Sequence, residues 1–145
     1  MPQLPILYLL DTNILVHLVR GDAVWGRVRA TFQPLLTDPR PIISVVTAGE
    51  LRSLAFQFNW KTEKIDQVEY YLGYFKRVSI DDAEIIRAYS VIDAQTQRIG
   101  QPLGKNDAWI AATASVTGAR LLTTDKDFDQ LDPVFLSRDW IDPTG

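Results

Sequence analysis

Short apolar runs alternate with longer amphipathic segments along this chain. The run ILYLL at residues 6–10 is uninterrupted, as in a strand buried on both faces, and TNILVHLV then follows helical spacing until Gly21. The same alternation continues to the end of the sequence. It predicts strands at 6–10, 42–44, 76–80, 119–125 and 134–137, and helices at 12–20, 25–36, 46–58, 62–75, 81–100 and 106–118.

Strands separated by helical segments indicate a parallel sheet with helices on both faces. Neither internal repeats nor low-complexity linkers divide the 145 residues, and this length suits one domain with a real core. We therefore expect one α/β domain spanning residues 1–145, built as a sandwich around a mainly parallel sheet. Thr62 is a plausible N-cap of its helix, and Asp81 or Asp82 that of the next.

Composition narrows the possible chemistry. The chain has no cysteine, which excludes disulfides and thiolate sites, and its single histidine, His17, leaves little room for imidazole catalysis. A net charge of -3 argues against a large basic surface for nucleic acid. Residues 6–19 are apolar, but Asp11 and Asn13 interrupt them, so we expect a cytoplasmic protein that does not enter a membrane.

Four carboxylates stand at junctions between predicted elements. Asp11 and Asp125 each follow an apolar strand, and in parallel sheets ligands bind outside the carboxyl ends of the strands. Glu50 and Asp107 lie near the beginnings of helices that could reach the same edge. Asp11, Asp107 and Asp125 could instead be helix caps, and Glu50 a solvated residue. Together, acids without basic partners are typical of a Mg²⁺ or Mn²⁺ site.

The motifs LLDTNIL, TAGEL, NDAWIAATA and LLTTDKDF occur in the order found in the PIN-domain ribonucleases, which the chain closely resembles. Its short length is similar to that of the VapC toxins of toxin–antitoxin pairs. The resemblance implies a PIN-like three-layer sandwich and maps the family's acidic quartet to Asp11, Glu50, Asp107 and Asp125. The supporting positions it implies are Asn13, Thr124 and, as an additional outer acid, Asp127. Some family members carry a further acid where this chain has Asn106, which leaves the binding of a second metal open.

The resemblance further implies hydrolysis of RNA phosphodiester bonds with Mg²⁺ or Mn²⁺ as cofactor. Asp11, Asp107 and Asp125 would hold the metal, and Glu50 would either ligate it or orient the attacking water. Asn13 and Thr124 would hydrogen-bond these acids. The expected partners are an RNA substrate, a cognate antitoxin and a second copy of the chain in a homodimer.

Three other functions fit parts of the pattern. A haloacid-dehalogenase-like phosphatase needs a second aspartate where this chain has Asn13, and a receiver-like domain needs an acceptor aspartate where the strand IIS ends in Ser44. A PIN-like module that binds RNA or protein without cutting is the third alternative.

Other polar and aromatic residues are ambiguous. Candidate phosphate contacts, each of which could equally be a solvated surface charge, are Arg20, Arg52, Lys105 and Lys126. The segments FQFNW and YYLGYF carry more aromatic residues than one core-facing stripe needs, which leaves two interpretations, a partner surface and a plain core. We expect His17 to be structural and Trp109 to lie in the core with Ala111, Ala112 and Ala114.

Overall fold

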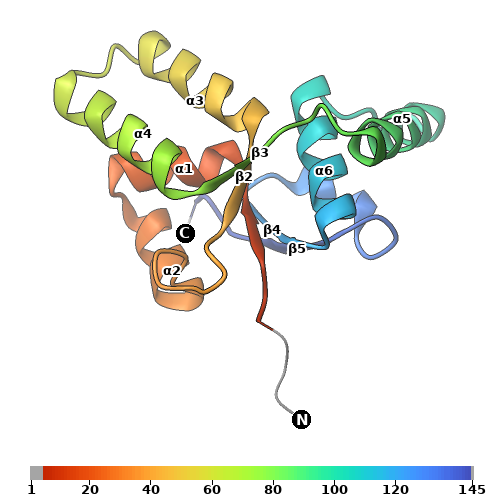
Figure 1. Ribbon diagram of the computed structural model, residues 1–145, viewed down its shortest axis with the longest axis horizontal. Helices are drawn as coiled ribbons and strands as arrows, with labels where there is room; N and C mark the ends of the chain where they lie inside the picture. Colours follow the sequence, from red (N-terminus) through yellow and green to blue (C-terminus); the bar gives the residue numbers. More distant parts are fainter. Residues whose placement is uncertain (1–4, 145) are drawn as a thin grey trace.

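The computed structural model describes residues 5–144 of the chain, so residues 1–4 and 145 of the expected domain lie outside the described part. Five short strands form the middle of the molecule and helices cover both sides of them (Figure 1). The strands are β1 (Tyr8–Leu10), β2 (Ile42–Ser44), β3 (Lys76–Val78), β4 (Arg120–Thr123) and β5 (Ser137–Trp140). The helices are α1 (Thr12–Arg20), α2 (Ala23–Phe32), α3 (Val45–Gln57), α4 (Thr62–Tyr74), α5 (Ala83–Arg98), α6 (Lys105–Thr117) and the 3₁₀ helix η1 (Lys126–Leu131).

The strands form one sheet in the order β3-β2-β1-β4-β5, and every neighbouring pair is parallel. β1 is therefore the central strand, and the later strands extend the sheet first to one edge and then to the other. This confirms the predicted α/β class with a parallel sheet, and the two layers of helices make it a three-layer sandwich (Figure 1).

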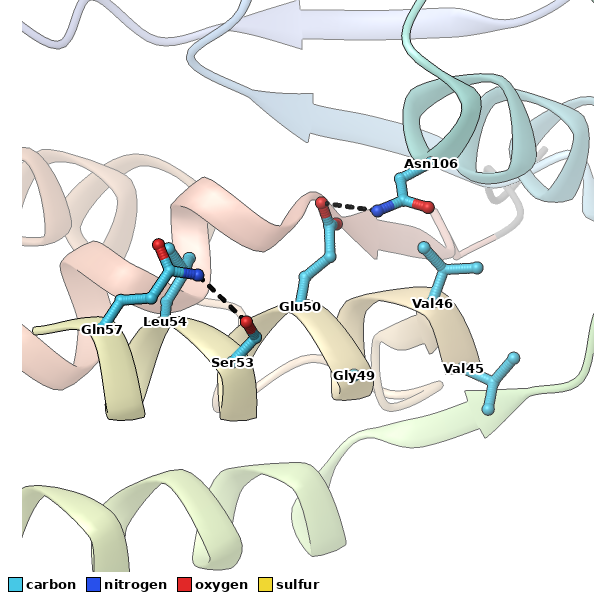
Figure 2. A pocket seen from close by; sticks show the side chains of 8 residues that line it. All are labelled: Val45, Val46, Gly49, Glu50, Ser53, Leu54, Gln57 and Asn106. Carbon is cyan, nitrogen blue, oxygen red and sulfur yellow. Dashed lines mark hydrogen bonds between the residues drawn. The ribbon is translucent and has the colours of Figure 1, made fainter.

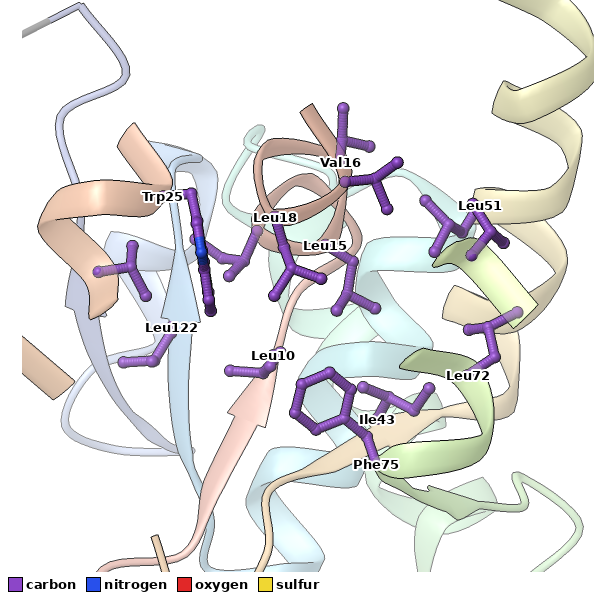
Figure 3. Packing of buried hydrophobic residues seen from close by; sticks show 14 of the residues in the cluster. Leu10, Leu15, Val16, Leu18, Trp25, Ile43, Leu51, Leu72, Phe75 and Leu122 are labelled. Atoms are coloured by element: carbon purple, nitrogen blue, oxygen red, sulfur yellow. The ribbon is translucent and has the colours of Figure 1, made fainter. Parts of the chain in front are cut away.

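Two apolar cores fill the space between the layers. Leu10, Ile43 and Leu122 point toward the layer of α1 to α4, where they pack with Leu15, Trp25, Leu72 and Phe75 (Figure 3). Their neighbours in the same strands, Leu9, Ile42 and Leu121, pack on the other face against α5, α6 and η1. Successive strand residues face opposite sides of a sheet, so a sheet with helices on both faces requires strands that are apolar at every position.

The local signals place most element boundaries to within about two residues. Gly21 ends α1 and Gly118 ends α6, both with positive φ angles, a conformation glycine adopts without steric cost. Asp82 caps α5, with its carboxylate accepting hydrogen bonds from two backbone amides of the first turn. Trp109 is partly buried against the second core and stacks on Tyr89, as expected of a core residue.

Three of the differences from the sequence prediction have a local structural cause. Thr62 is the first residue of α4 rather than its N-cap, a position taken by Lys61 without a side-chain hydrogen bond. α2 ends at Phe32 instead of Leu36, because Gln33 adopts a left-handed conformation that stops the helix. The last strand covers 137–140 instead of 134–137, since its residues pair in register with β4 from Ser137 onward.

The chain leaves β1 and β4 in opposite directions. After β1 it enters α1, which belongs to the first core, whereas after β4 it enters η1, which packs in the second core. Such a divergence between adjacent parallel strands opens a crevice at their carboxyl ends, the usual ligand position in open α/β sheets. None of the helices described within residues 5–144 is long and apolar enough to cross a membrane.

Candidate functional site

Asp11 lies at the floor of the crevice and is almost fully buried. One carboxylate oxygen accepts a hydrogen bond from the backbone amide of Thr12 at 2.8 Å, which makes Asp11 the N-cap of α1. The other accepts from the Thr123 hydroxyl at 2.7 Å and from the Asn13 side-chain amide at 3.1 Å. The cap and site interpretations of Asp11 are thus both compatible with its geometry.

A hydrogen-bond network joins the ends of β1 and β4 beneath the site. The Asn13 side-chain oxygen accepts from the backbone amide of Thr124 at 3.2 Å, and the Thr123 hydroxyl accepts from the backbone amide of Asp125 at 3.0 Å. Asn13 therefore bonds an acid as expected. Thr124 does not: it contributes its backbone amide, and the hydroxyl that bonds Asp11 is that of Thr123, which the sequence analysis missed.

Exchanging each threonine for valine should separate these two positions. Thr123→Val removes a hydroxyl bonded to a buried charge, so we expect a loss of about 2 kcal/mol in the free energy of unfolding. Thr124→Val keeps the backbone amide and should cost less than about 0.5 kcal/mol. Urea unfolding in chelator measures both values. Equal losses would show that the Thr123 hydroxyl bond contributes no more than an ordinary contact.

Glu50 reaches the crevice from the first half of α3 and is held from two sides. One carboxylate oxygen accepts from the buried Thr12 hydroxyl at 2.7 Å, and the other from the Asn106 amide at 3.1 Å (Figure 2). The Thr12 hydroxyl oxygen is in turn 3.0 Å from the hydroxyl oxygen of Thr47, which is also buried. Glu50 is therefore a tethered residue of the site rather than a freely solvated one. Beside it lies a pocket of about 500 Å³ along α3.

Asp107, Asp125 and Asp127 form the tightest acidic group. Each can place a carboxylate oxygen within 4.8 Å of the other two, close enough to share one cation. Asp107 stands in the first turn of α6, which is capped by Gly104, so Asp107 is not a helix cap. Asp125 does cap η1, and its carboxylate accepts from the backbone amide of Asp127 at 2.8 Å. The structure thus places Asp127 beside the quartet rather than outside it.

Burial and mutual repulsion weaken the acidity of two of these groups. Burial raises the pKa of Asp11 to about 6, against hydrogen bonds from Thr123 and Thr12, and the charges of Glu50 and Asp125 raise it further. Burial also raises the pKa of Asp107 to about 7, assisted by the charges of all four other acids of the site. No ion pair formed within residues 5–144 includes any of the five. A divalent cation is the partner this excess of negative charge lacks.

The candidate basic residues differ in what they contact. Arg52 pairs with Glu69 at 2.8 Å, and Lys105 pairs with Asp93 at 3.3 Å, so both charges are compensated on the surface. Lys126 lies 4.5 Å from the ring centre of Trp140. Arg20 stands at the end of α1, with its guanidinium 4.9 Å from the ring centre of Phe58.

The aromatic helices contribute to both the core and the surface. Trp60, Tyr71, Tyr74 and Phe75 pack in or against the first core, whereas Phe56 is 83% exposed and Tyr70 is 65% exposed. His17 is half-buried, and its Nδ1 lies 2.6 Å from a carboxylate oxygen of Asp22, which fits the expected structural role.

Comparison with known proteins agrees with this architecture. The family model of the PIN domain matches residues 8–133. Ribonuclease VapC1 of Haemophilus influenzae strain R2866 is 29% identical over 128 residues, which cover 86% of this chain and 92% of that protein.

Solved structures of toxin–antitoxin proteins share the fold. The VapBC2 structure from Rickettsia felis, bound to a promoter DNA fragment, matches with a TM-score of 0.78 at 20% identity, covering 94% of this chain and all of the matched one. A toxin–antitoxin complex from Klebsiella pneumoniae matches with a TM-score of 0.68 at 23% identity, covering 86% of this chain and 92% of the matched one.

The family match spans strands β1 to β4, the four predicted motifs and the crevice that contains the acids, and only the edge strand β5 lies beyond it. Membership excludes the haloacid-dehalogenase and receiver alternatives, which belong to other folds. This chain is a member of the PIN domain family.

Proposed function

We propose that this protein is a metal-dependent endoribonuclease and the toxin of a two-protein toxin–antitoxin system. The observation that carries the proposal is the acidic crevice, where the three carboxylates of Asp107, Asp125 and Asp127 converge beside Asp11 and Glu50. A relative of similar length is named a ribonuclease, and PIN-domain ribonucleases depend on divalent metal ions.

The donor set fits Mg²⁺ or Mn²⁺. All five side chains offer carboxylate oxygens, the ligands that these hard cations prefer. Asp107, Asp125 and Asp127 would hold the ion, with Asp11 as a further ligand from the floor of the crevice. When bound, the metal supplies a positive charge that stabilises the phosphodiester transition state and acidifies a water molecule.

The chain's own residues position the remaining groups. Hydrogen bonds from Thr12 and Asn106 fix the two oxygens of Glu50, leaving its other lone pairs to accept a proton from the attacking water. Thr123 and Asn13 fix the rotamer of Asp11 in the same way. Asp11, Glu50, Asp107 and Asp125 are therefore the proposed catalytic residues.

RNA is the proposed substrate and a small antitoxin the proposed regulator. A single strand can bend its backbone into a narrow acidic crevice, which a regular duplex cannot. The Klebsiella pneumoniae match is a toxin–antitoxin complex, which supports a protein partner for this chain as well. Homodimer formation and a cytoplasmic location stay predictions; light scattering of the purified protein measures the first.

Incubating the purified protein with labelled single-stranded RNA should test this function. We expect cleavage in Mg²⁺ or Mn²⁺, none in chelator, and none of a DNA of equal sequence. Overproduction in bacteria should arrest growth, and co-production of the small protein encoded beside the gene should relieve the arrest. Binding of RNA without cleavage in any metal would instead support the non-cleaving alternative.

A further inference from the structure

A groove of about 320 Å³ leads away from the acidic crevice between α1 and α3. Asp11, Glu50 and Asp107 line its beginning, and Leu54 lies on its α3 side. Its α1 wall consists of residues 13, 16, 17 and 20, which share one face of the helix at helical spacing. Because α1 rises about 1.5 Å per residue, the groove extends roughly 10 Å from the crevice to Arg20.

At the far end of this groove two cations, Arg20 and Lys64, flank two aromatic rings. The Arg20 guanidinium lies 4.9 Å from the Phe58 ring centre, and the rings of Phe58 and Trp60 are 5.5 Å apart. The Lys64 ammonium follows, 5.6 Å from the Trp60 ring centre. In the part of the chain that the structure describes, neither Arg20 nor Lys64 forms an ion pair, unlike Arg52 and Lys105.

We infer that Arg20 and Phe58, here called the Arg20–Phe58 platform, bind the nucleotide next to the scissile phosphate in single-stranded RNA. The inference rests on the proposed ribonuclease function and names the substrate-binding residues of that site. Proteins that grip single strands combine cationic grooves with rings on which bases stack, and guanidinium planes stack bases as well. Phe58 is 43% exposed and can therefore reach a base.

The charges favour RNA over a protein segment as occupant. The crevice end of the groove is strongly negative and the platform end is positive, so an occupant must contact a metal-loaded acidic site and a free cation in succession. A phosphodiester backbone meets both demands with one repeating unit: one phosphate lies at the metal site and the next pairs with Arg20. Its unpaired base then stacks on the platform.

Steady-state cleavage of a short single-stranded RNA should test the platform. We expect Arg20→Gln and Phe58→Leu each to raise KM about tenfold, the effect of losing one stacked base or its paired phosphate, with kcat nearly unchanged. Phe58→Tyr keeps the ring and should restore the wild-type KM. The double variant should raise KM by less than the product of the two single increases, because both residues contact the same nucleotide.

Binding without cleavage provides an independent readout. In the Asp107→Asn background, fluorescence anisotropy with the same RNA should show a slope of log K against log salt that is about 0.7 shallower for Arg20→Gln and unchanged for Phe58→Leu. Arg52→Gln and Phe56→Leu are the matched controls, since Arg52 is paired with Glu69 and Phe56 is exposed on the same helix. Thermal melting confirms that each variant folds.

Three results would overturn the inference: platform variants no weaker than their controls, a loss confined to kcat, or a loss of affinity for the antitoxin with RNA binding intact. If the wild-type protein cleaves RNA and the platform variants are no weaker than their controls, the inference fails but the ribonuclease function stands. Absence of cleavage with platform-dependent RNA binding would instead refute the ribonuclease function alone.

Discussion

Asp107→Asn is expected to lower kcat for RNA cleavage at least about 100-fold, the usual cost of removing one group that stabilises transition-state charge. The amide keeps the shape of the side chain but loses the negative charge, in a residue whose carboxylate faces all four other acids of the site. Excess Mn²⁺ should restore part of the activity, because losing one ligand lowers the affinity for the metal while the other residues of the site stay in place.

Asp129→Asn is the matched control for this loss. Asp129 lies in the same short 3₁₀ helix as Asp127, and its carboxylate pairs with Arg138 at 2.9 Å. An exposed pair of this kind contributes little to stability. Asp129→Asn should therefore leave kcat within about twofold of wild type, because it removes a charge of η1 and leaves the five acids of the site unchanged. Wild-type kcat for Asp107→Asn in saturating Mg²⁺, measured on protein free of other nucleases, would remove Asp107 from the catalytic group.

Metal-free protein should be less stable at pH 8 than at pH 5. Asp11 and Asp107 have folded pKa values of about 6 and about 7, above the ordinary 3.8, so the folded state binds protons that the unfolded chain releases. Stability is then highest below the ordinary pKa and is lost as pH rises through 6 and 7. Asp11 alone contributes about 1.4 kcal/mol between pH 5 and 8, a shift of roughly 3 to 6 °C in Tm.

Mn²⁺ should reverse the sign of this dependence. The ion binds the ionised carboxylates of the folded state, so it stabilises most at high pH, by about 2.7 kcal/mol at a hundredfold excess over Kd. Asp107→Asn should melt above wild type in chelator at pH 8 and gain less from Mn²⁺. Differential scanning calorimetry at both pH values measures each effect. A metal-free Tm that rises from pH 5 to pH 8 would contradict the assignment of the raised pKa values.

Asp11→Asn should behave differently from Asp107→Asn in chelator. Three groups donate hydrogen bonds to the Asp11 carboxylate, and an amide nitrogen in place of either oxygen would face a donor. Within the described residues, no group donates a hydrogen bond to the Asp107 carboxylate. Neutralising Asp107 therefore relieves charge repulsion and breaks no hydrogen bond. Neutralising Asp11 relieves repulsion but also breaks a hydrogen bond.

The positions of the acids could be predicted because they depend on local patterns. Apolar runs ending in Asp11 and Asp125 fix where two parallel strands stop, and the carboxyl ends of such strands share one edge of the sheet. The choice between Thr123 and Thr124 could not be predicted this way. Side chains alternate along a strand, so an uncertainty of one residue in its end exchanges the two hydroxyls.

Contacts between distant segments were also beyond the sequence pattern. The Asn106 amide meets Glu50 only because α6 begins beside α3, and Arg20 meets Phe58 only because α1 and α3 end near each other. Neither pair has a periodicity or cap signal that links its members. The same holds for Asp127, whose approach to Asp107 depends on the tight turn into η1.

The central place of β1 in the sheet has a consequence for synthesis. β1 is made first, yet it acquires β4 as its second neighbour only after residue 123 has left the ribosome, and the bond between Asp11 and Thr123 spans 112 positions. A growing chain thus carries Asp11 and Glu50 long before Asp125 exists. The acidic centre cannot form while most of the chain is being translated, so a nascent chain has no complete site until Asp125 has left the ribosome.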